Sequence, residues 1–258
     1  MTAAPLTPDH ADLTLLAWMV EMGADEAIGA EPVNRYAAPK PAPARRRKPA
    51  PEAPPDPVAS AAGIAAACTS LSELAEALAA FEGCALKKGA RTCVFADGNP
   101  AARLMVIGEA PGREEDRIGK PFVGRSGQLL DRMLAAIGLR RDDPDPAHAV
   151  YITNVLPWRP PENREPSTDE IAMMKAFLIR HIELADPDFL LLMGRSAAAT
   201  LLGTTIGITR LRGKWGEVLG RPALPTFHPA ALLRNPLQKR PVWADLLALQ
   251  ARMEDTAP

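Results

Sequence analysis

The sequence predicts an α/β layer fold with a mostly parallel sheet. Four short apolar runs have the length and composition of buried strands, and segments with helical periodicity lie between them. Strands that alternate with helices in this way form a parallel sheet with helices packed on its faces. The predicted strands span residues 103–108, 150–155, 189–194 and 224–228.

The predicted helices follow from capping residues and from apolar side chains at positions i, i+3 and i+4. Ser70 and Thr168 are suitable N-caps, and Ser196 opens a helix directly after the third predicted strand. The helices are expected at residues 13–28, 70–82, 127–137, 168–184, from 196 onward and at 242–252.

Composition divides the chain into regions of different character. Nine prolines between residues 32 and 57, with few large apolar side chains, predict a disordered linker. Its basic cluster at residues 45–48 is interpreted either as a non-specific phosphate tether or as ordinary solvated linker. The regions are a short helical segment (1–30), the Pro/Ala-rich basic linker (31–62), one folded domain (63–253) and a tail (254–258).

Charge and cysteine content limit the classes of protein that fit. The 258 residues carry a formal net charge of −1, so a DNA-binding surface must be a local arrangement of Lys and Arg. Three cysteines are too few for a secreted disulfide framework. We see neither a secretory leader nor an apolar run of membrane length, and therefore expect a cytoplasmic protein with no membrane partner.

Three polar clusters follow predicted strands, namely Gly108-Glu109, Asn154 and His228. Ligands in parallel α/β sheets bind at the carboxyl ends of strands, so these clusters are expected to meet at one site. Each has a structural explanation when taken alone, as a turn, a loop-capping amide or a histidine before proline. Their combination is more specific.

Three ordered motifs contain these clusters. The first covers residues 108–127 and includes Gly-Glu-Ala-Pro-Gly, Glu-Asp and Gly-Lys-Pro-Phe-Val-Gly-Arg-Ser-Gly. The second combines residues 150–155 with 159–166, and the third is residues 226–234. In order and spacing they resemble family four of the uracil-DNA glycosylase superfamily over nearly the whole predicted domain.

The resemblance implies a three-layer α/β/α sandwich with a central, mostly parallel four-stranded sheet. It also implies a DNA repair enzyme that hydrolyses the N-glycosidic bond of uracil and leaves an abasic site. A base stacked in DNA is out of reach, so the uracil must rotate into a pocket. The expected partner is uracil-containing DNA, single- or double-stranded, and we expect a monomer.

The resemblance assigns several residues to the base. The Asn154 carboxamide donates to uracil O4 and accepts from N3–H, a pattern that cytosine reverses. Phe122 stacks on the uracil, the alternative being a core side chain. His228 donates to O2 as negative charge develops there, and the backbone around Gly108 and Ala110 assists.

The catalytic carboxylate is less clearly assigned, because Ala110 stands where the best-known branch has Asp. Glu109 is the first candidate for holding water or the base edge, and Asp116 is the second. Glu115 resembles the residue that excludes the methyl group of thymine. All three also fit as ordinary loop or helix-start residues.

Leu232, Leu233 and Arg234 resemble the loop that enters the duplex, with an apolar wedge and an arginine that reaches a phosphate. A simple helix start is the competing interpretation. Ser126 and Gly127, at the beginning of a helix, are expected to bind a DNA phosphate.

The usual members hold a [4Fe–4S] cluster with four cysteines, but only Cys84 is present here. Phe81, Trp158 and Met174 occupy the other three positions. One thiolate cannot hold such a cluster, so we expect no cofactor and no metal. We hypothesise that the three apolar side chains fill the vacated volume around Cys84.

Two alternatives to uracil excision stay open. One is a catalytically weak member that binds DNA or abasic sites, which Ala110 and the missing cysteines would permit. The other is a glycosylase for hypoxanthine or xanthine. A branch that traps DNA covalently carries a histidine in the central segment, and residues 160–166 contain none, so ordinary turnover is expected.

Overall fold

The computed structural model describes residues 8–24 and 56–256, which belong to two separate units. In the first unit the described residues form helix α1 (Pro8–Glu21), which begins and ends earlier than the predicted helix at 13–28. Most of the predicted linker, residues 31–55, lies outside the described residues. The second unit, Pro54–Pro258, holds the remaining described elements.

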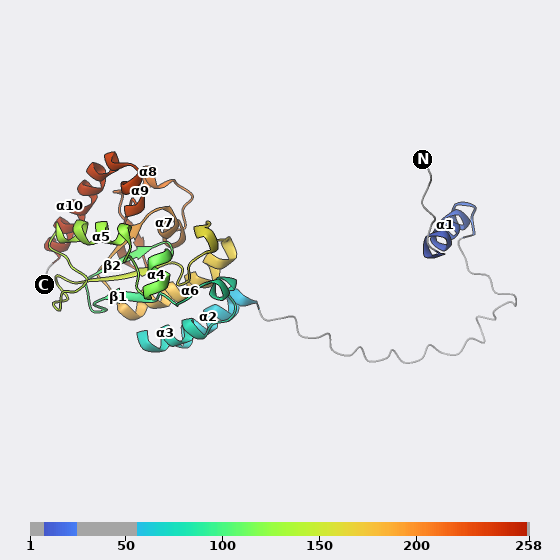
Figure 1. Cartoon of the computed structure of the whole chain (residues 1–258), viewed down its shortest axis with the longest axis horizontal. Coiled ribbons are helices and arrows are strands. Elements are labelled where there is room, and N and C mark those ends of the chain that lie inside the picture. The colour runs from blue at the N-terminus through green and yellow to red at the C-terminus, as the bar shows by residue number, and fades with distance from the viewer. Residues whose placement is uncertain (1–7, 25–55, 257–258) are drawn as a thin grey trace. The chain divides into compact units, whose positions relative to one another are not determined.

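A six-stranded sheet in the order β1-β3-β2-β4-β6-β5 forms the centre of the second unit (Figure 1). The four inner strands are parallel, as predicted: β3 (Val150–Asn154), β2 (Leu104–Gly108), β4 (Phe189–Met193) and β6 (Arg221–Thr226). Two antiparallel strands that the sequence did not predict lie at the edges, β1 (Ala96–Gly98) and β5 (Gly216–Val218). Each has three residues, which is too short to produce a readable period.

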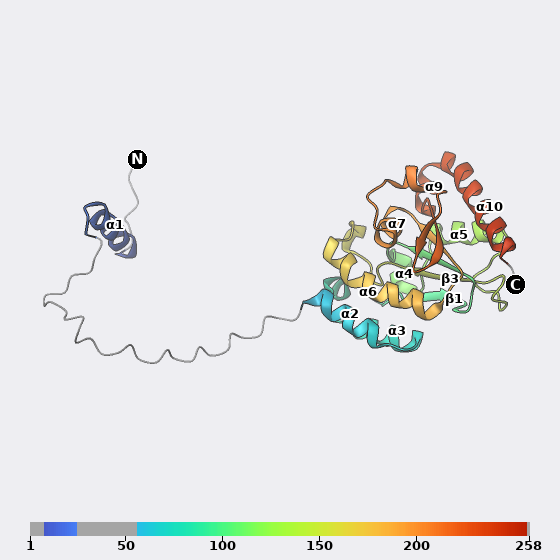
Figure 2. The same cartoon turned by 180° about the vertical axis from the view of Figure 1, so that it is seen from behind.

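Helices cover both faces of this sheet (Figures 1 and 2). Met105 and Ile107 of β2 belong to one hydrophobic cluster, with α2 (Pro57–Ala67), α3 (Leu71–Ala80), α6 (Thr168–Ala185) and α7 (Arg195–Leu202). Leu104 and Val106 belong to the other, with α5 (Arg125–Ala135), α9 (Pro229–Arg234) and α10 (Lys239–Asp255). Successive strand residues point to opposite faces, so a strand buried on both sides becomes a continuous apolar run. The result is the predicted three-layer sandwich.

The folded unit begins earlier than the predicted boundary at residue 63. Helix α2 starts at Pro57, and the side chain of Asp56 caps it by accepting from the Val58 amide at 3.0 Å. Proline is well suited to the first turn of a helix, because its missing N–H would have no helical partner there. A proline that the composition assigned to the linker therefore starts a helix of the core. Helix α10 likewise continues to Asp255, past the predicted end at 253.

Short elements occupy the loops: η1 (Ala85–Gly89), α4 (Arg113–Ile118), η2 (Pro161–Asn163), α8 (Ile208–Leu211) and η3 (Pro236–Gln238). Of these, α4 and η2 follow strands β2 and β3 at their carboxyl ends. Among the described residues, no helix has both the length and the apolar character needed to cross a membrane.

Candidate active site

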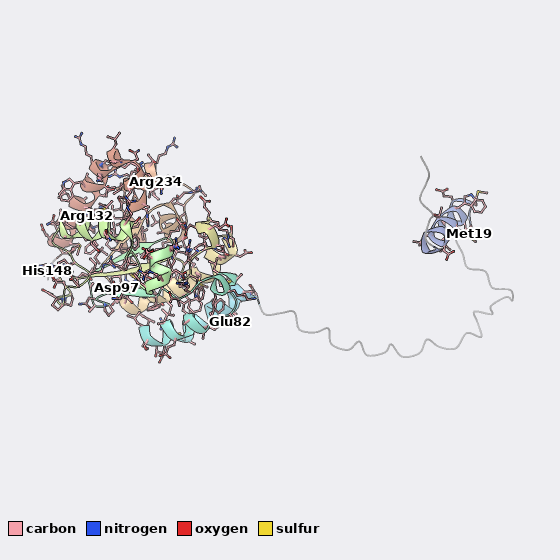
Figure 3. The ribbon with its side chains drawn as sticks, viewed as in Figure 1. Met19, Glu82, Asp97, Arg132, His148 and Arg234 are labelled. Carbon is pink, nitrogen blue, oxygen red and sulfur yellow. The ribbon has the colours of Figure 1, made fainter. Side chains whose placement is uncertain are left out.

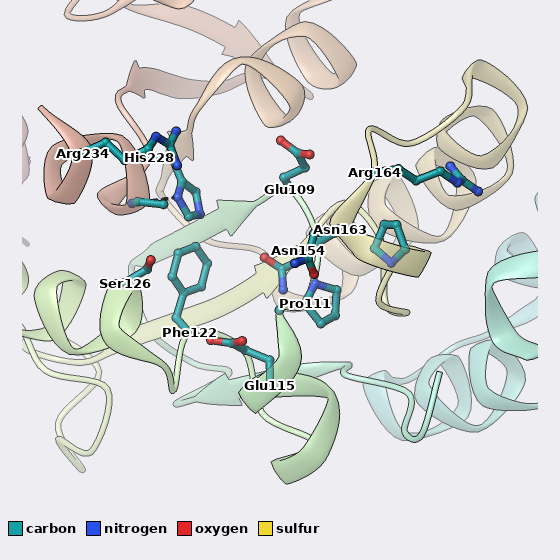
Figure 4. A pocket seen from close by; sticks show the side chains of 14 residues that line it. Glu109, Pro111, Glu115, Phe122, Ser126, Asn154, Asn163, Arg164, His228 and Arg234 are labelled. Atoms are coloured by element: carbon teal, nitrogen blue, oxygen red, sulfur yellow. Dashed lines mark hydrogen bonds between the residues drawn. The ribbon is translucent and has the colours of Figure 1, made fainter. Parts of the chain in front are cut away.

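A pocket of about 490 Å³ lies at the carboxyl ends of β2, β3 and β6 (Figure 4). Its volume is in the range usual for small-ligand sites. The pocket collects most of the side chains that the sequence predicted to act together. It is lined by Glu109, Ala110, Pro111, Gly112, Glu115, Phe122, Ser126, Asn154, Pro160, Asn163, Arg164, His228, Ala230 and Arg234.

Gly108 brings Asn154 and Phe122 close together at the pocket floor. It ends β2 opposite Asn154 of β3. A Cβ atom on this glycine would lie 2.3 Å from Asn154 Oδ1 and 2.6 Å from the Phe122 ring. Both neighbours therefore use the space that a side chain would fill, which explains why this strand ends in glycine. The absence of a side chain at Gly108 therefore explains the glycine at this position without any contact to a base.

Phe122 lies in a tight turn with φ of +52°, which is unfavourable for a residue with a side chain. Arg141 fixes this turn by donating to the carbonyls of Pro121 at 3.0 Å and Phe122 at 2.9 Å. Gly127 packs against the same turn, since a Cβ there would lie 1.8 Å from the Phe122 carbonyl oxygen. Gly127 is thus buried and positions Phe122, whereas the sequence assigned it to a DNA phosphate.

His228 is the N-cap of α9, and its Nδ1 accepts from the Ala230 amide at 3.1 Å. This bond leaves the proton of a neutral imidazole on Nε2. Burial, reinforced by the charge of Arg234 and opposed by Glu115, lowers the pKa of His228 to about 4. The ring stacks on Phe122 with centroids 5.3 Å apart. At neutral pH the site therefore holds an uncharged histidine that donates from Nε2.

Glu109 faces the pocket between His228 and Asn154 (Figure 4). Burial, together with the charge of Glu165, raises the pKa of its carboxyl group. Within the described residues its carboxylate forms no hydrogen bond or ion pair. Its backbone oxygen accepts from the Leu156 amide at 3.0 Å, which holds the loop in place. Glu109 is therefore fixed at the backbone and free at the side chain.

Two of the three acidic residues of helix α4, Glu115 and Asp116, accept hydrogen bonds from backbone amides. Glu115 accepts from the amides of Val123 at 3.1 Å and Gly124 at 2.9 Å, and so ties α4 to the Phe122 turn. Asp116 does not line the pocket; it accepts from the amides of Arg91 at 2.8 Å and Thr92 at 3.3 Å. Its placement in the catalytic group is therefore corrected. Buried carboxylates of this kind are retained because backbone N–H groups satisfy them.

The predicted DNA-entering residues separate in the structure. Leu232 is 1% exposed and packs in the core, so its assignment as a wedge is corrected. Leu233 is 39% exposed, and Arg234 lines the pocket with Ser126. Leu237 of η3, which has no predicted role, is 86% exposed and lies a few residues beyond Arg234. Leu237 lies between Pro236 and Gln238 and belongs to no apolar period in the sequence. Only its exposure in the fold identifies it as a candidate for DNA contact.

The positions aligned with the cluster cysteines form part of one buried core. Phe81, Cys84, Trp158 and Met174 are each 5% exposed or less and belong to the same hydrophobic cluster. Burial raises the pKa of the Cys84 thiol, which disfavours the thiolate that a metal needs. Nowhere in residues 8–24 or 56–256 do three His, Cys, Asp or Glu side chains group as a metal site. The residues present do not fit an iron–sulfur cluster.

Other lining residues come from the proline-rich excursion after β3. Asn163 and Arg164 line the pocket, but the Arg164 guanidinium points away from its centre (Figure 4) and binds both carboxylate oxygens of Glu170, at 2.6 and 2.9 Å. In the sequence this segment belongs to the second motif, residues 159–166, whose individual residues have no predicted role. Its place after a central parallel strand was the signal that it borders a site.

Comparisons with known proteins agree with this geometry. A family model described as the uracil DNA glycosylase superfamily matches residues 95–247. The chain is 42% identical over 154 residues to a type-4 uracil-DNA glycosylase of Thermotoga maritima, covering 59% of this chain and 77% of that protein. It is 39% identical over 179 residues to the type-4 enzyme of Archaeoglobus fulgidus, covering 65% and 85%. A type-5 uracil-DNA glycosylase of Pyrobaculum aerophilum is 32% identical over 150 residues, covering 54% and 66%.

Proposed function

Because the chain belongs to the uracil-DNA glycosylase superfamily, we propose that it removes uracil from DNA by hydrolysing the N-glycosidic bond and leaves an abasic site. One observation carries this proposal. One pocket collects a carboxamide, an aromatic ring, a neutral histidine and a carboxylate, from Asn154, Phe122, His228 and Glu109, and within the described residues neither the carboxamide nor the carboxylate has a side-chain partner.

Asn154 selects the base. Within the described residues its carboxamide makes no hydrogen bond, so it is free to donate to O4 and accept from N3–H of uracil. Cytosine presents a donor and an acceptor in the reverse order, and the mismatch would leave buried polar groups unpaired. Phe122 supplies the stacking face, and its strained turn fixes the ring before the base arrives.

His228 stabilises the leaving group. Cleavage places negative charge on uracil and positive character on the sugar, so a donor aimed at O2 lowers the barrier. The Nε2–H of a neutral imidazole is suited to this, because it donates without the ring first having to gain a second proton. Glu109 then faces the sugar, where its carboxylate stabilises the cation and orients the attacking water. Because the pKa of Glu109 is raised, its carboxylate is ionised only above that raised pKa, and activity should fall as the pH drops through it.

The substrate strand is held by side chains around the pocket mouth. Arg234 and Ser126 contact phosphate, and the exposed Leu233 and Leu237 fill the gap that the rotated base leaves in a duplex. We propose that the enzyme acts as a cytoplasmic monomer on uracil-containing DNA, single- or double-stranded. Elution in gel filtration at the mass of a dimer would contradict the monomer.

The enzyme is also proposed to work without an iron–sulfur cluster. Support comes from the chemistry of the four positions, where burial and dispersion among Phe81, Trp158 and Met174 replace metal bonds around Cys84. Colourless purified protein with no stoichiometric iron is the expected result. Iron at about four atoms per chain would overturn it.

An oligonucleotide with one uracil tests the activity directly. Wild-type protein should generate an alkali-labile site at the uracil, and the matching thymine oligonucleotide should stay intact. His228→Ala should reduce the single-turnover rate by about two to three orders of magnitude, as loss of one transition-state donor does. His148→Ala is the matched control, because this histidine is exposed, pairs with Asp145 and lies outside the pocket.

The same assay separates the alternatives. A gel shift without cleavage would identify a DNA-binding protein that has lost the reaction. Cleavage at hypoxanthine or xanthine but not at uracil would assign a different deaminated base. Full activity of Asn154→Ala on uracil would contradict the assigned base recognition.

A further inference from the structure

A second hollow, of about 290 Å³, lies beside the uracil pocket and is lined mainly by arginines. Four arginines line it, and the acidic residues of its lining are Glu114 and Asp116. The arginines come from three separate segments, so the fold and not a single charged run brings them together. They are Arg91 before β1, Arg113 and Arg117 of α4, and Arg159 after β3.

The positive charge of this arginine hollow is only partly neutralised. Arg117 pairs with Glu114 at 2.9 Å, and the Asp116 carboxylate is engaged by the backbone amides of Arg91 and Thr92. In the part of the chain that the structure describes, the guanidinium groups of Arg91 and Arg113 have no acidic partner. Four cations against two acids leave a local excess of two positive charges, in a chain whose net charge is −1.

The arginine hollow shares a wall with the uracil pocket. Gly112 lines the pocket and the next residue, Arg113, lines the hollow. In the same way Pro160 lines the pocket and the preceding residue, Arg159, lines the hollow. Arg159 also donates from Nε to Asn163 Oδ1 at 2.9 Å, and Asn163 borders the pocket. In Figure 4, Pro111 and Asn163 lie on the opposite side of Asn154 from Ser126 and Arg234. Cationic sites therefore flank the pocket on both sides.

We propose that the arginine hollow binds a backbone phosphate of the uracil-bearing strand, on the side of the pocket opposite Arg234. The inference rests on the proposed function, because only a base bound in the pocket places a strand across both sites. Arginine matches a phosphate geometrically, with parallel N–H donors that meet two oxygens. A strand anchored on both sides of one nucleotide is held while that nucleotide rotates out, so these contacts position the base without reading its sequence.

The test pairs protein charges with individual phosphates. Oligonucleotides carry one tetrahydrofuran abasic analogue, which cannot be cleaved, and one neutral methylphosphonate linkage placed in turn at each position around it. Fluorescence anisotropy measures their dissociation constants for wild-type protein, Arg113→Ala and Arg91→Ala. Arg132→Ala removes an equal charge from an exposed position on α5 that borders neither cavity (Figure 3).

We expect one linkage, on one side of the analogue, at which methylphosphonate weakens wild-type binding by about tenfold, the usual effect of one charge-assisted hydrogen bond. Arg113→Ala should bind the unmodified strand about tenfold more weakly and be insensitive to the neutral linkage there. Its slope of log Kd against log salt should fall by about 0.7, the value for one contact on a single strand. Arg132→Ala should behave as wild type.

Two results would overturn the proposal. One is that Arg113→Ala and Arg91→Ala bind as tightly as Arg132→Ala. The other is that the neutral linkage weakens wild type and Arg113→Ala equally at every position. Because binding is the readout, failure of uracil cleavage is a separate result: protein that binds these strands with the expected pattern but never cleaves uracil refutes the function and keeps the hollow.

Discussion

Arg141 is expected to control the position of Phe122, although it lies outside the pocket. Its guanidinium donates to the carbonyls of Pro121 and Phe122 and pairs with Asp97 at 3.0 Å and Asp131 at 2.7 Å. Replacing it by alanine removes two charge-assisted bonds from a turn that has a positive φ at Phe122. Without these bonds nothing offsets the cost of the positive φ, about 1–3 kcal/mol, so we expect the turn to relax.

The size of the effect follows from the burial of the group. Breaking a buried ion pair from one side costs about 3–5 kcal/mol, and the Arg141 side chain is 15% exposed. Lys120 remains on Asp97 at 2.9 Å; burial raises the pKa of that carboxyl, but Lys120 and Arg141 together hold it below its usual value. Asp97 is therefore not left alone in Arg141→Ala, and we expect the lower end, about 3 kcal/mol of unfolding free energy.

Urea unfolding and steady-state kinetics on a uracil oligonucleotide measure the two consequences. Arg141→Ala should lower the unfolding midpoint and reduce kcat/KM by about a hundredfold, as expected when a catalytic surface moves by an ångström. The neighbouring Arg140 is the matched control, because it is exposed and, among the described residues, its side chain pairs only with Asp142 at the surface. Arg140→Ala should change stability by less than about 1 kcal/mol and leave the rate unchanged. Equal behaviour of the two variants would refute the reasoning.

Three further predictions concern the site, the core and the duplex. Gly108→Ala should retain the fold by circular dichroism but lose about a hundredfold in kcat/KM, because the added Cβ displaces Asn154; undiminished activity would contradict the packing argument. Burial lowers the pKa of His181 to about 3, so the unfolded chain, with a pKa near 6.5, binds a proton that the folded state does not, and stability should fall by about 2 kcal/mol between pH 6.5 and 5. His181→Gln should remove this contribution from the pH dependence in urea titrations and leave the contribution of His228, whose pKa is also lowered by burial; an unchanged slope would exclude His181 as a source. Leu237→Ala should reduce kcat/KM about tenfold on duplex uracil DNA and leave it unchanged on single strands. Leu219→Ala, which also removes an exposed leucine, should leave kcat/KM unchanged on both substrates. Equal losses of Leu237→Ala on both substrates would argue against a wedge.

The parts of the fold that could be predicted from the sequence are those with a clear pattern of apolar residues. Strands β2, β3 and β4 are buried on both faces, so each appears as a mostly apolar run; β2 ends in Gly108, β3 ends in Asn154, and Gly194 follows β4. Motif position alone could not tell which way a side chain faces: Asp116 follows Glu115 directly and points to another segment, and Leu232 precedes the exposed Leu233 but packs inward.

Arg141 was missed for a different reason. It lies in an Arg-Arg-Asp-Asp run that resembles a solvated surface loop, and it is 19 residues from Phe122 in the chain. Its role arises only when the fold brings two carbonyl oxygens and two carboxylates around it. Contacts of this kind have no local sequence signal, because the partners are set by topology and not by spacing along one element.

The short helix α4 clarifies how the catalytic carboxylate is chosen. Glu115 holds the turn of Phe122, and Asp116 holds the segment at Arg91, so both acids of this motif are committed to backbone amides that fix the pocket wall. A carboxylate that accepts backbone N–H bonds cannot turn toward a sugar cation without leaving those donors unsatisfied. Glu109 has no such commitment in the described residues and lies on the pocket side of the same loop. Of the three candidate acids, Glu109 is therefore the one that we propose for the chemistry, even though Ala110 occupies the position at which the best-known branch has Asp.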